Sequence, residues 1–386
     1  MNTKKMMPAY FAVAFVWFTT HFGGGFASGA QVVQYFVAYG WYAAFLPIVS
    51  QALLAVIFYY AWKFALDKKK YDYKSWTLEF YKPVEKVMSP IFEIIYQLLL
   101  ITGTAIAFAT GGATITAVFG TSYIINTIVI AVGMLLLTIF GAKLVRDAAS
   151  VMAIAIIVGM LVVYVPNVIA AWGDITANIA GLKSGAIVND ASFGSALWKT
   201  LMYAGFQAAA LGAYLAHSNA LKDVNEAKKA AIWGFVLNAS ILAISTLGIM
   251  GFYKDGILKE TVPALFVVMH GVGSSWMTPL ISILVILGSI STGVNLIFGI
   301  TSRVVTFLAR NDTDAIKIEK ETKRSALVSL GYVVFTWCVA QFGLIPLIAK
   351  GYGTIGYISI FVIILPLLIK GIIGWKPVNK DKDIAL

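Results

Sequence analysis

Long apolar segments separated by short polar breaks run along almost the whole chain. Of its 386 residues, 60% are hydrophobic and only 12% are charged, whereas a soluble domain carries about 25% charged residues. A transmembrane helix needs about 20 apolar residues, so ten such spans would use most of the chain. The pattern predicts an all-α polytopic membrane protein and excludes a cytosolic enzyme, a nucleic-acid binder and a single-pass receptor.

The predicted spans follow from the apolar runs and the polar breaks between them. A further apolar stretch, 262–271, is too short to cross a bilayer and predicts a short helix packed on one face. The ten spans cover residues 8–39, 41–66, 88–116, 121–141, 147–172, 195–216, 227–252, 277–305, 325–342 and 345–372.

The basic residues are distributed unequally over the two sides that these spans define. Of the 29 Lys and Arg residues, 24 fall on the side of the chain termini. Lys and Arg are enriched in cytoplasmic loops, so this split predicts that both termini are cytoplasmic. We expect a multi-pass protein of a prokaryotic plasma membrane, surrounded by the lipid bilayer. The sequence predicts no nucleic-acid partner and no particular oligomeric state.

The chain carries a weak internal repeat. Gly25-Phe26 in span 1 and Gly205-Phe206 in span 6 stand 180 residues apart. Because five is an odd number, a second unit of five spans must cross the membrane with the opposite topology. The predicted organisation is a first five-helix repeat (1–172), an extracellular connection (173–194), an inverted second repeat (195–372) and a cytoplasmic tail (373–386).

Three consecutive glycines, Gly23, Gly24 and Gly25, lie in the middle of span 1. Glycine permits unusual backbone angles and close approach of a ligand, so the run predicts a helix broken at mid-membrane. A broken helix has unpaired N–H groups that attract a carboxylate and unpaired carbonyls that coordinate a cation. The alternative reading is close helix–helix packing through small residues.

Ten spans with breaks in spans 1 and 6 and a five-plus-five inverted repeat resemble the LeuT fold of the amino acid–polyamine–organocation superfamily. The segment 23–31 also resembles the Gly-x-Gly-Phe-Ala-Ser-Gly-Gln-Glu stretch of the YkvI-like amino acid permeases. Two positions depart from that stretch, because Ala30 stands where Gln is usual and Gln31 where Glu is usual.

The resemblance implies a sodium ion between the span 1 break and span 8. Gly288, Ser291 and Thr292 have the i, i+3, i+4 spacing that places them on one helical face, and carbonyls near Thr19 and Phe22 would complete the site. Alternatively, the two hydroxyls bond back to their own helix, as is common in membrane helices. Proton-coupled relatives can replace this ion with a span 5 lysine. Span 5 here contains none, which favours sodium.

The same resemblance places the substrate between the two breaks. Backbone amides of Gly24, Gly25 and Phe26 would hold a carboxylate, and carbonyls of 204–206 would accept from an ammonium group. For the aromatic residues, simple core packing is the alternative. The full set of predicted substrate-binding residues is Phe22, Gly23, Gly24, Gly25, Phe26, Thr102, Phe108, Ala204, Gly205, Phe206 and Gln207.

Three ionisable residues within the spans are candidates for coupling or gating, because charge inside a membrane is costly and often functional. His21 precedes the glycines and could carry a proton, contact the substrate or cap the freed backbone. Lys350 could line an outer gate or extend to the outer interface. Glu93 could serve an inner gate or pair with a basic residue of the inner loops.

These features predict a secondary active transporter that moves an amino acid or amino acid-like solute with sodium by alternating access. Alternatives are a proton-coupled symporter or exchanger involving His21, an amine or betaine transporter, and a channel or sensor. We expect no enzyme, because the three histidines are far apart and acidic residues avoid the span centres. The expected ligands are a small-molecule substrate and a sodium ion, with no cofactor.

Overall fold

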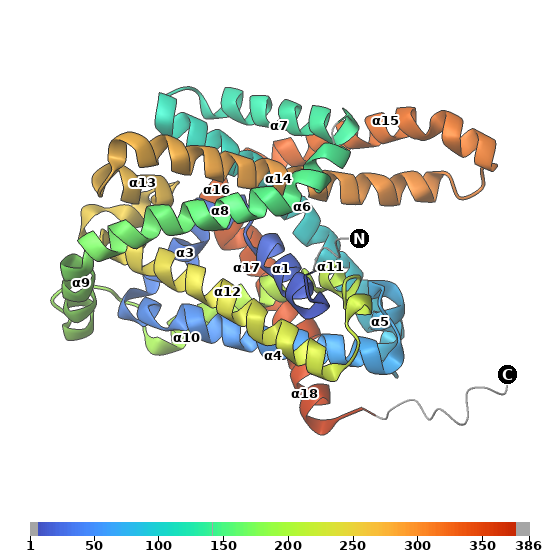
Figure 1. Cartoon of the computed structure of the whole chain (residues 1–386), viewed down its shortest axis with the longest axis horizontal. Helices are drawn as coiled ribbons and strands as arrows, with labels where there is room; N and C mark the ends of the chain where they lie inside the picture. The colour runs from blue at the N-terminus through green and yellow to red at the C-terminus, as the bar shows by residue number, and fades with distance from the viewer. Residues whose placement is uncertain (1–6, 141, 376–386) are drawn as a thin grey trace, which may run out of the picture.

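The chain folds into helices in the computed structural model, which describes residues 7–140 and 142–375 (Figure 1). Within these ranges the chain forms no β-strand. Most of the predicted tail, 376–386, and the first six residues lie outside the described residues.

Six helical segments among the described residues are long and apolar enough to cross a membrane. A seventh is possible if α8 (Ala142–Ala170) and α9 (Trp172–Ser184), which bend by 71° at their junction, form one span. The chain is therefore a polytopic α-helical membrane protein. The six segments are α4 (Leu46–Lys68), α6 (Glu85–Phe119), α7 (Tyr123–Phe140), α12 (Val224–Met250), α14 (Ser274–Leu308) and Leu344–Ile373.

The remaining predicted spans coincide with interrupted or partly charged helices. Span 1 consists of α1 (Ala9–His21), α2 (Gly24–Ala27) and α3 (Ala30–Tyr35). Span 6 consists of α10 (Phe193–Ala208) and α11 (Leu211–Leu215). Span 9 is the apolar part of α15 (Asp314–Ala340), whose first turns carry charges. The tenth span contains α16 (Leu344–Pro346), α17 (Gly353–Ser359) and α18 (Leu365–Ile373), joined by π-helical turns.

Shorter helices join these spans. The predicted short helix is confirmed as α13 (Pro263–His270). The stretch 173–194, predicted as a polar connection, begins with most of α9. A 3-10 segment (Val37–Ala44) precedes α4 in the sequence, and α5 (Tyr73–Phe80) follows it. The repeat boundaries stay a prediction.

Side-chain caps fix where several helices begin. Asp72 accepts a hydrogen bond from the Ser75 amide at 2.9 Å before α5, and Asp223 accepts one from the Glu226 amide at 2.8 Å before α12. Such caps satisfy amides that have no partner inside the helix. The bonds from Ser75 also hold the pKa of the Asp72 carboxyl below its usual value.

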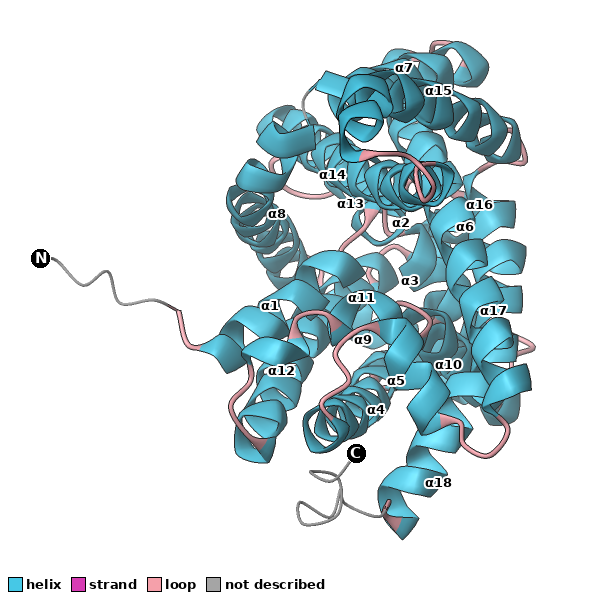
Figure 2. Ribbon diagram, turned by 90° about the vertical axis from the view of Figure 1, so that its right-hand side faces the viewer, coloured by secondary structure: helices cyan, strands magenta, loops and turns pink. Residues whose placement is uncertain are grey.

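The spans pack as two groups of helices that are visible in Figures 1 and 2. In one group α12 packs on α1 and α4, and α10 packs on α4 and α17. In the other, α6, α7, α14 and α15 pack on one another. Helix α8 contacts both α12 and α14. The broken span 1 lies between the groups, because α2 packs on α6 and α14.

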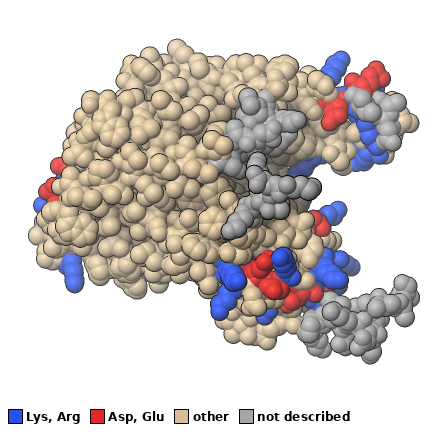
Figure 3. Space-filling view, in the orientation of Figure 1, with Lys and Arg blue, Asp and Glu red and all other residues tan. Residues whose placement is uncertain are grey.

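Charged residues gather mainly at one end of the molecule (Figure 3). This end carries α5 and the turn between α14 and α15, two regions that the basic-residue count predicts to be cytoplasmic. A recess separates its two charged groups, and a broad surface without Lys, Arg, Asp or Glu extends toward α9 on this face. The distribution is that expected of a protein embedded in a bilayer.

Candidate functional site

Span 1 is broken where its glycines predict. Helix α1 ends at His21, and Gly23 takes an extended conformation with φ −72° and ψ 173°. Among the described residues, no backbone amide donates to the carbonyls of Thr19 or Phe22. Unpaired carbonyls inside a membrane are tolerated where they line a cavity.

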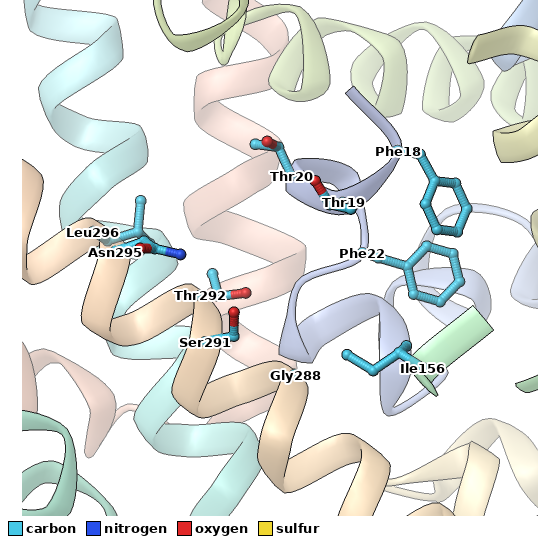
Figure 4. Close-up of a pocket in the computed structure, with 10 residues that line it drawn as sticks. All are labelled: Phe18, Thr19, Thr20, Phe22, Ile156, Gly288, Ser291, Thr292, Asn295 and Leu296. Carbon is cyan, nitrogen blue, oxygen red and sulfur yellow. The ribbon is translucent and has the colours of Figure 1, made fainter. Parts of the chain in front are cut away.

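A cavity of about 140 Å³ lies beside this break, between α1 and α14. Figure 4 shows Ser291 and Thr292 of α14 facing the segment that carries Thr19 and Phe22. A Cβ atom placed on Gly288 would lie 4.0 Å from the Phe22 carbonyl oxygen, so the helix and the break are close here. All five predicted sodium-binding residues line this one cavity: Thr19, Phe22, Gly288, Ser291 and Thr292.

The hydroxyls on α14 differ in what they bind. Ser289 donates to the Val285 carbonyl of its own helix at 2.8 Å. The hydroxyls of Ser291 and Thr292 make no such bond within the described part of the chain, so they are available to a ligand. Asn295 also lines the cavity. Sequence reasoning missed it, although its position seven residues after Gly288 places it on the same helical face.

A second cavity, of about 80 Å³, lies on the other side of the glycines. It shares Thr20, Thr292 and Leu296 with the first cavity. Gly23, Gly24 and Gly25, three of the predicted substrate-binding residues, line it. The other lining residues are His21, Gln31, Leu99, Gly103, Ile106, Phe206, Gln207, Ala210 and Tyr352.

The backbone amides at the break are partly free. The amides of Gly24 and Gly25 have no backbone acceptor among the described residues, whereas the Phe26 amide donates to the Gly23 carbonyl at 3.0 Å. Phe26 is buried and packs on Phe22, with 4.2 Å between ring centroids. The predicted carboxylate site therefore has two available backbone amides, those of Gly24 and Gly25, instead of three, because the Phe26 amide already donates to Gly23.

Span 3 turns a different face to the cavity from the one predicted. Leu99, Gly103 and Ile106 line it at i, i+4 and i+7, the spacing of one helical face. Thr102 instead contacts span 10, where a Cβ on Gly351 would lie 2.8 Å from its methyl carbon. Phe108 is fully buried in the core.

Span 6 is interrupted later than predicted. Helix α10 continues to Ala208, and the carbonyl of Gly205 accepts from the Ala209 amide at 3.1 Å. The expected free carbonyl at Gly205 is therefore occupied. Gly205 packs so closely on span 10 that a Cβ would overlap the Gly356 carbonyl oxygen. Ala204 is fully buried, while Phe206 and Gln207 line the second cavity as predicted.

Aromatic contacts join spans 1, 6 and 10 beside this cavity. The Phe206 ring stacks on Tyr352 with centroids 4.4 Å apart and an interplanar angle of 4°. Tyr35 of α3 donates to the Ile348 carbonyl at 3.0 Å. Large aromatic side chains supply extensive contact area, so these contacts hold spans 1, 6 and 10 together beside the cavity.

His21 connects the two broken spans. Its ring is 3% exposed, and Nε2 is hydrogen-bonded to the Tyr203 hydroxyl of α10. The His21 side chain also interacts with the side chain of Asn238 on α12. His21 lines the second cavity, so it is placed to contact a bound solute.

Glu93 and Lys350 lie away from both cavities' linings. Glu93 accepts from Gln97 at 2.5 Å and faces Arg303 of α14 with 4.0 Å between Oε1 and Nη1. The Arg303 guanidinium also lies over the rings of Tyr73 and Tyr96, 4.9 Å from each centroid. Lys350 is exposed in a π-helical turn (Leu347–Tyr352).

Within the described residues there is no group of three or more His, Cys, Asp or Glu that could hold a metal ion. The two cavities therefore offer backbone, hydroxyl and amide groups instead of a cluster of charged or imidazole ligands. Such neutral oxygen ligands suit a hard monovalent cation and a small polar solute.

The sequence matches no protein-family model and no curated protein. The fold is similar to that of a Na⁺-coupled sialic acid symporter solved in a substrate-bound outward-open state. That similarity has a TM-score of 0.61 at 14% identity and covers 96% of this chain and 91% of the symporter. A manganese transporter from Eremococcus coleocola aligns at a TM-score of 0.49 and 14% identity, over 98% of this chain and 90% of the transporter. The first similarity establishes the fold.

Proposed function

We propose that this chain is a secondary transporter that moves a small amino acid-like solute together with sodium. The observation that carries the proposal is that all five predicted sodium-binding residues line one cavity. Two of them offer carbonyls without an amide donor among the described residues, Thr19 and Phe22. The fold shared with a Na⁺-coupled symporter supports the same reading.

The solute would bind in the adjacent cavity. Its carboxylate would accept hydrogen bonds from the amides of Gly24 and Gly25, which have no backbone acceptor in the described chain. Broken helices near the bilayer midplane hold anionic substrate groups and sodium in this way. Transport would proceed as the two helix groups move against each other around the site, with both termini cytoplasmic.

Uptake into proteoliposomes tests the proposal. Pools of labelled amino acids are offered under an inward sodium gradient, an equal potassium gradient and an inward proton gradient. We expect accumulation with sodium alone. No accumulation of any amino acid under these gradients would contradict the solute class and direct the assay to amines and betaines.

A double substitution tests the ion site. Ser291→Ala with Thr292→Ala removes two hydroxyl ligands and should abolish sodium dependence. Ser282→Ala is the matched control, because Ser282 lies on the same helix and donates to the Thr278 carbonyl at 2.7 Å. Unchanged sodium dependence in the double variant would show that sodium does not bind in this cavity.

Proton coupling is the second candidate, because His21 lines the solute cavity and bonds to Tyr203. Imidazole is the side chain whose usual pKa lies nearest neutrality. Accumulation driven by protons alone, and lost in His21→Gln, would favour this candidate. Sodium-driven accumulation that survives His21→Gln would exclude it.

A further inference from the structure

Gln31 places an unused hydrogen-bond acceptor at the solute cavity. Its side chain belongs to α3, just beyond the break, and is 3% exposed. It lines the 80 Å³ cavity, and its Oε1 atom has no hydrogen-bond partner among the described residues. An unpaired buried acceptor is costly, so an acceptor kept at a binding cavity is suited to a donor on the ligand.

Gly25 determines where this amide lies. A Cβ atom at position 25 would stand 2.7 Å from Nε2 of Gln31 and 3.1 Å from a methyl carbon of Ile106. The absence of a side chain on Gly25 therefore lets the amide group rest against the backbone of the break. The Gln31 amide and the Gly25 N–H, which has no backbone acceptor in the described chain, therefore lie next to each other at the break.

The cavity lining carries no acidic or strongly basic side chain. None of the described residues that line it is Lys, Arg, Asp or Glu. Gln31 and Gln207 contribute neutral amides, and His21 contributes an imidazole that bonds to Tyr203. A charged substrate side chain would be buried here without a partner, which is strongly unfavourable. The cavity has a volume of about 80 Å³, smaller than the adjacent cavity of about 140 Å³, so it favours a small solute.

From these observations we infer that Gln31 binds the ammonium group of a small amino acid without net charge. Its Oε1 accepts a hydrogen bond from the substrate ammonium group, while the carboxylate lies on the amides of Gly24 and Gly25. This inference rests on the proposed function and names its substrate class: a zwitterion the size of glycine, alanine or serine.

Equilibrium binding to the solubilised full-length protein tests this independently of the coupling ion. Labelled glycine, alanine, serine, lysine and glutamate are each offered to the native protein. We expect binding of the three neutral solutes only. Gln31→Met keeps the length of the side chain and removes its acceptor, so affinity for alanine should fall about tenfold, the effect of one lost hydrogen bond to a charged group.

Gln51→Met is the matched control. Gln51 is also fully buried, and both its amide atoms lack partners within the described chain, but it lies in α4 and outside the cavity lining. We expect its alanine affinity to equal that of the native protein. Equal loss in both variants would show a general packing effect and overturn the inference.

Gln31→Glu adds a readout of which substrate group lies at position 31. A carboxylate at this position would pair with the substrate ammonium group, whereas it would repel a substrate carboxylate. We expect alanine binding near pH 8 to be retained or strengthened, because charge-assisted hydrogen bonds are stronger than neutral ones. Loss of alanine binding near pH 8 would place the carboxylate beside position 31 and overturn the inference.

The outcomes separate the inference from the proposed function. If native protein binds neutral amino acids and Gln31→Met binds them with unchanged affinity, the role of Gln31 is overturned and the proposed function stands. A preference of the native protein for lysine or glutamate would also overturn this inference and leave the proposed function standing. If native protein binds no amino acid at all, the proposed function fails and this inference fails with it.

Discussion

At the break in span 1, Gly23 is extended and the carbonyls of Thr19 and Phe22 have no amide donor in the described chain. At the interruption in span 6, Ala209 and Ala210 keep right-handed helical angles. The carbonyls of Gly205 and Gln207 there accept from the amides of Ala209 and Ala210. The two breaks occupy corresponding places in the predicted repeat. The carbonyls of Thr19 and Phe22 at the first break have no amide donor in the described chain, whereas those of Gly205 and Gln207 at the second accept from amides.

This difference indicates that the two spans contribute different kinds of groups to the cavities. Under the proposed function, span 1 would supply backbone groups to an ion and a carboxylate, and its glycines leave room for both. Span 6 offers side chains, Phe206 and Gln207, while its glycine serves close packing against span 10. Substitutions at the two breaks should therefore fail in different ways.

The largest effect is expected at Gly205. A Cβ there overlaps the carbonyl oxygen of Gly356, and a backbone atom cannot rotate aside as a side chain can. Overpacking usually costs about 1–3 kcal/mol, and we expect Gly205→Ala to exceed that range. Size-exclusion profiles and thermal unfolding should show loss of the folded protein.

Gly194→Ala is the control for that change. Gly194 lies in the same helix, and its Cβ would have only the Ser192 hydroxyl nearby, at 3.8 Å. Its unfolding temperature should equal that of the native protein. A well-folded Gly205→Ala variant would mean that span 6 is not held by this packing.

At the first break, Gly24→Ala should impair transport more than folding. The added Cβ would overlap the Ser289 hydroxyl and lie 3.2 Å from Thr110 Cβ, and these side chains can shift. Because Ser289 lies on α14 between Gly288 and Ser291, two residues of the ion cavity, we expect sodium-driven uptake to fall about tenfold, about 1.4 kcal/mol, with folding retained. Uptake and unfolding temperature are measured together.

Two further alanine variants serve as comparisons for Gly24→Ala. Gly23→Ala meets Thr292 only at 3.4 Å, so its loss of uptake should be smaller than that of Gly24→Ala. Gly299→Ala, on α14 with nothing within 4 Å, should transport normally. If Gly23→Ala and Gly24→Ala lose uptake equally, contact with Ser289 is not the cause.

A moderate effect is expected where the two breaks are joined. Tyr203→Phe leaves Nε2 of buried His21 without its hydroxyl partner, which should lower the free energy of unfolding by about 1–3 kcal/mol. In a double-mutant cycle, Tyr203→Phe combined with His21→Phe should cost less than the sum of the single changes. Strict additivity would show that this bond does not connect the spans energetically.

The smallest effect is expected at Ala209. Its helical angles require no glycine, so Ala209→Gly should cost only about 0.5–1 kcal/mol of stability through backbone entropy. Uptake should be close to native. A large loss of uptake in this variant would mean that span 6 depends on a defined backbone geometry as much as span 1 does.

The sequence predicts the first break better than the second for a physical reason. Three adjacent glycines have few uses other than a break, whereas a single Gly205 fits a break and close packing equally well. The i, i+3, i+4 spacing of Gly288, Ser291 and Thr292 depends only on helix geometry, and these residues do line one cavity.

The face of span 3 could not be predicted in the same way. Leu99 and Gly103 line the cavity in place of Thr102 and Phe108, because the rotation of a helix about its axis is set by its neighbours. When the residues of a span are apolar on all sides, the sequence does not show which face of the helix points to the cavity. Gln31 is visible in the sequence only as a departure from a resembling motif, and its role depends on its contact with Gly25.

The two cavities share a wall formed by Thr20, Thr292 and Leu296. A cation on one side and a carboxylate on the other would attract each other across this wall, in surroundings that screen charge poorly. Thermodynamic linkage then requires reciprocity: the factor by which sodium raises solute affinity equals the factor by which solute raises sodium affinity. Under the proposed function, the residues shared by the two cavities would therefore make each ligand the allosteric effector of the other.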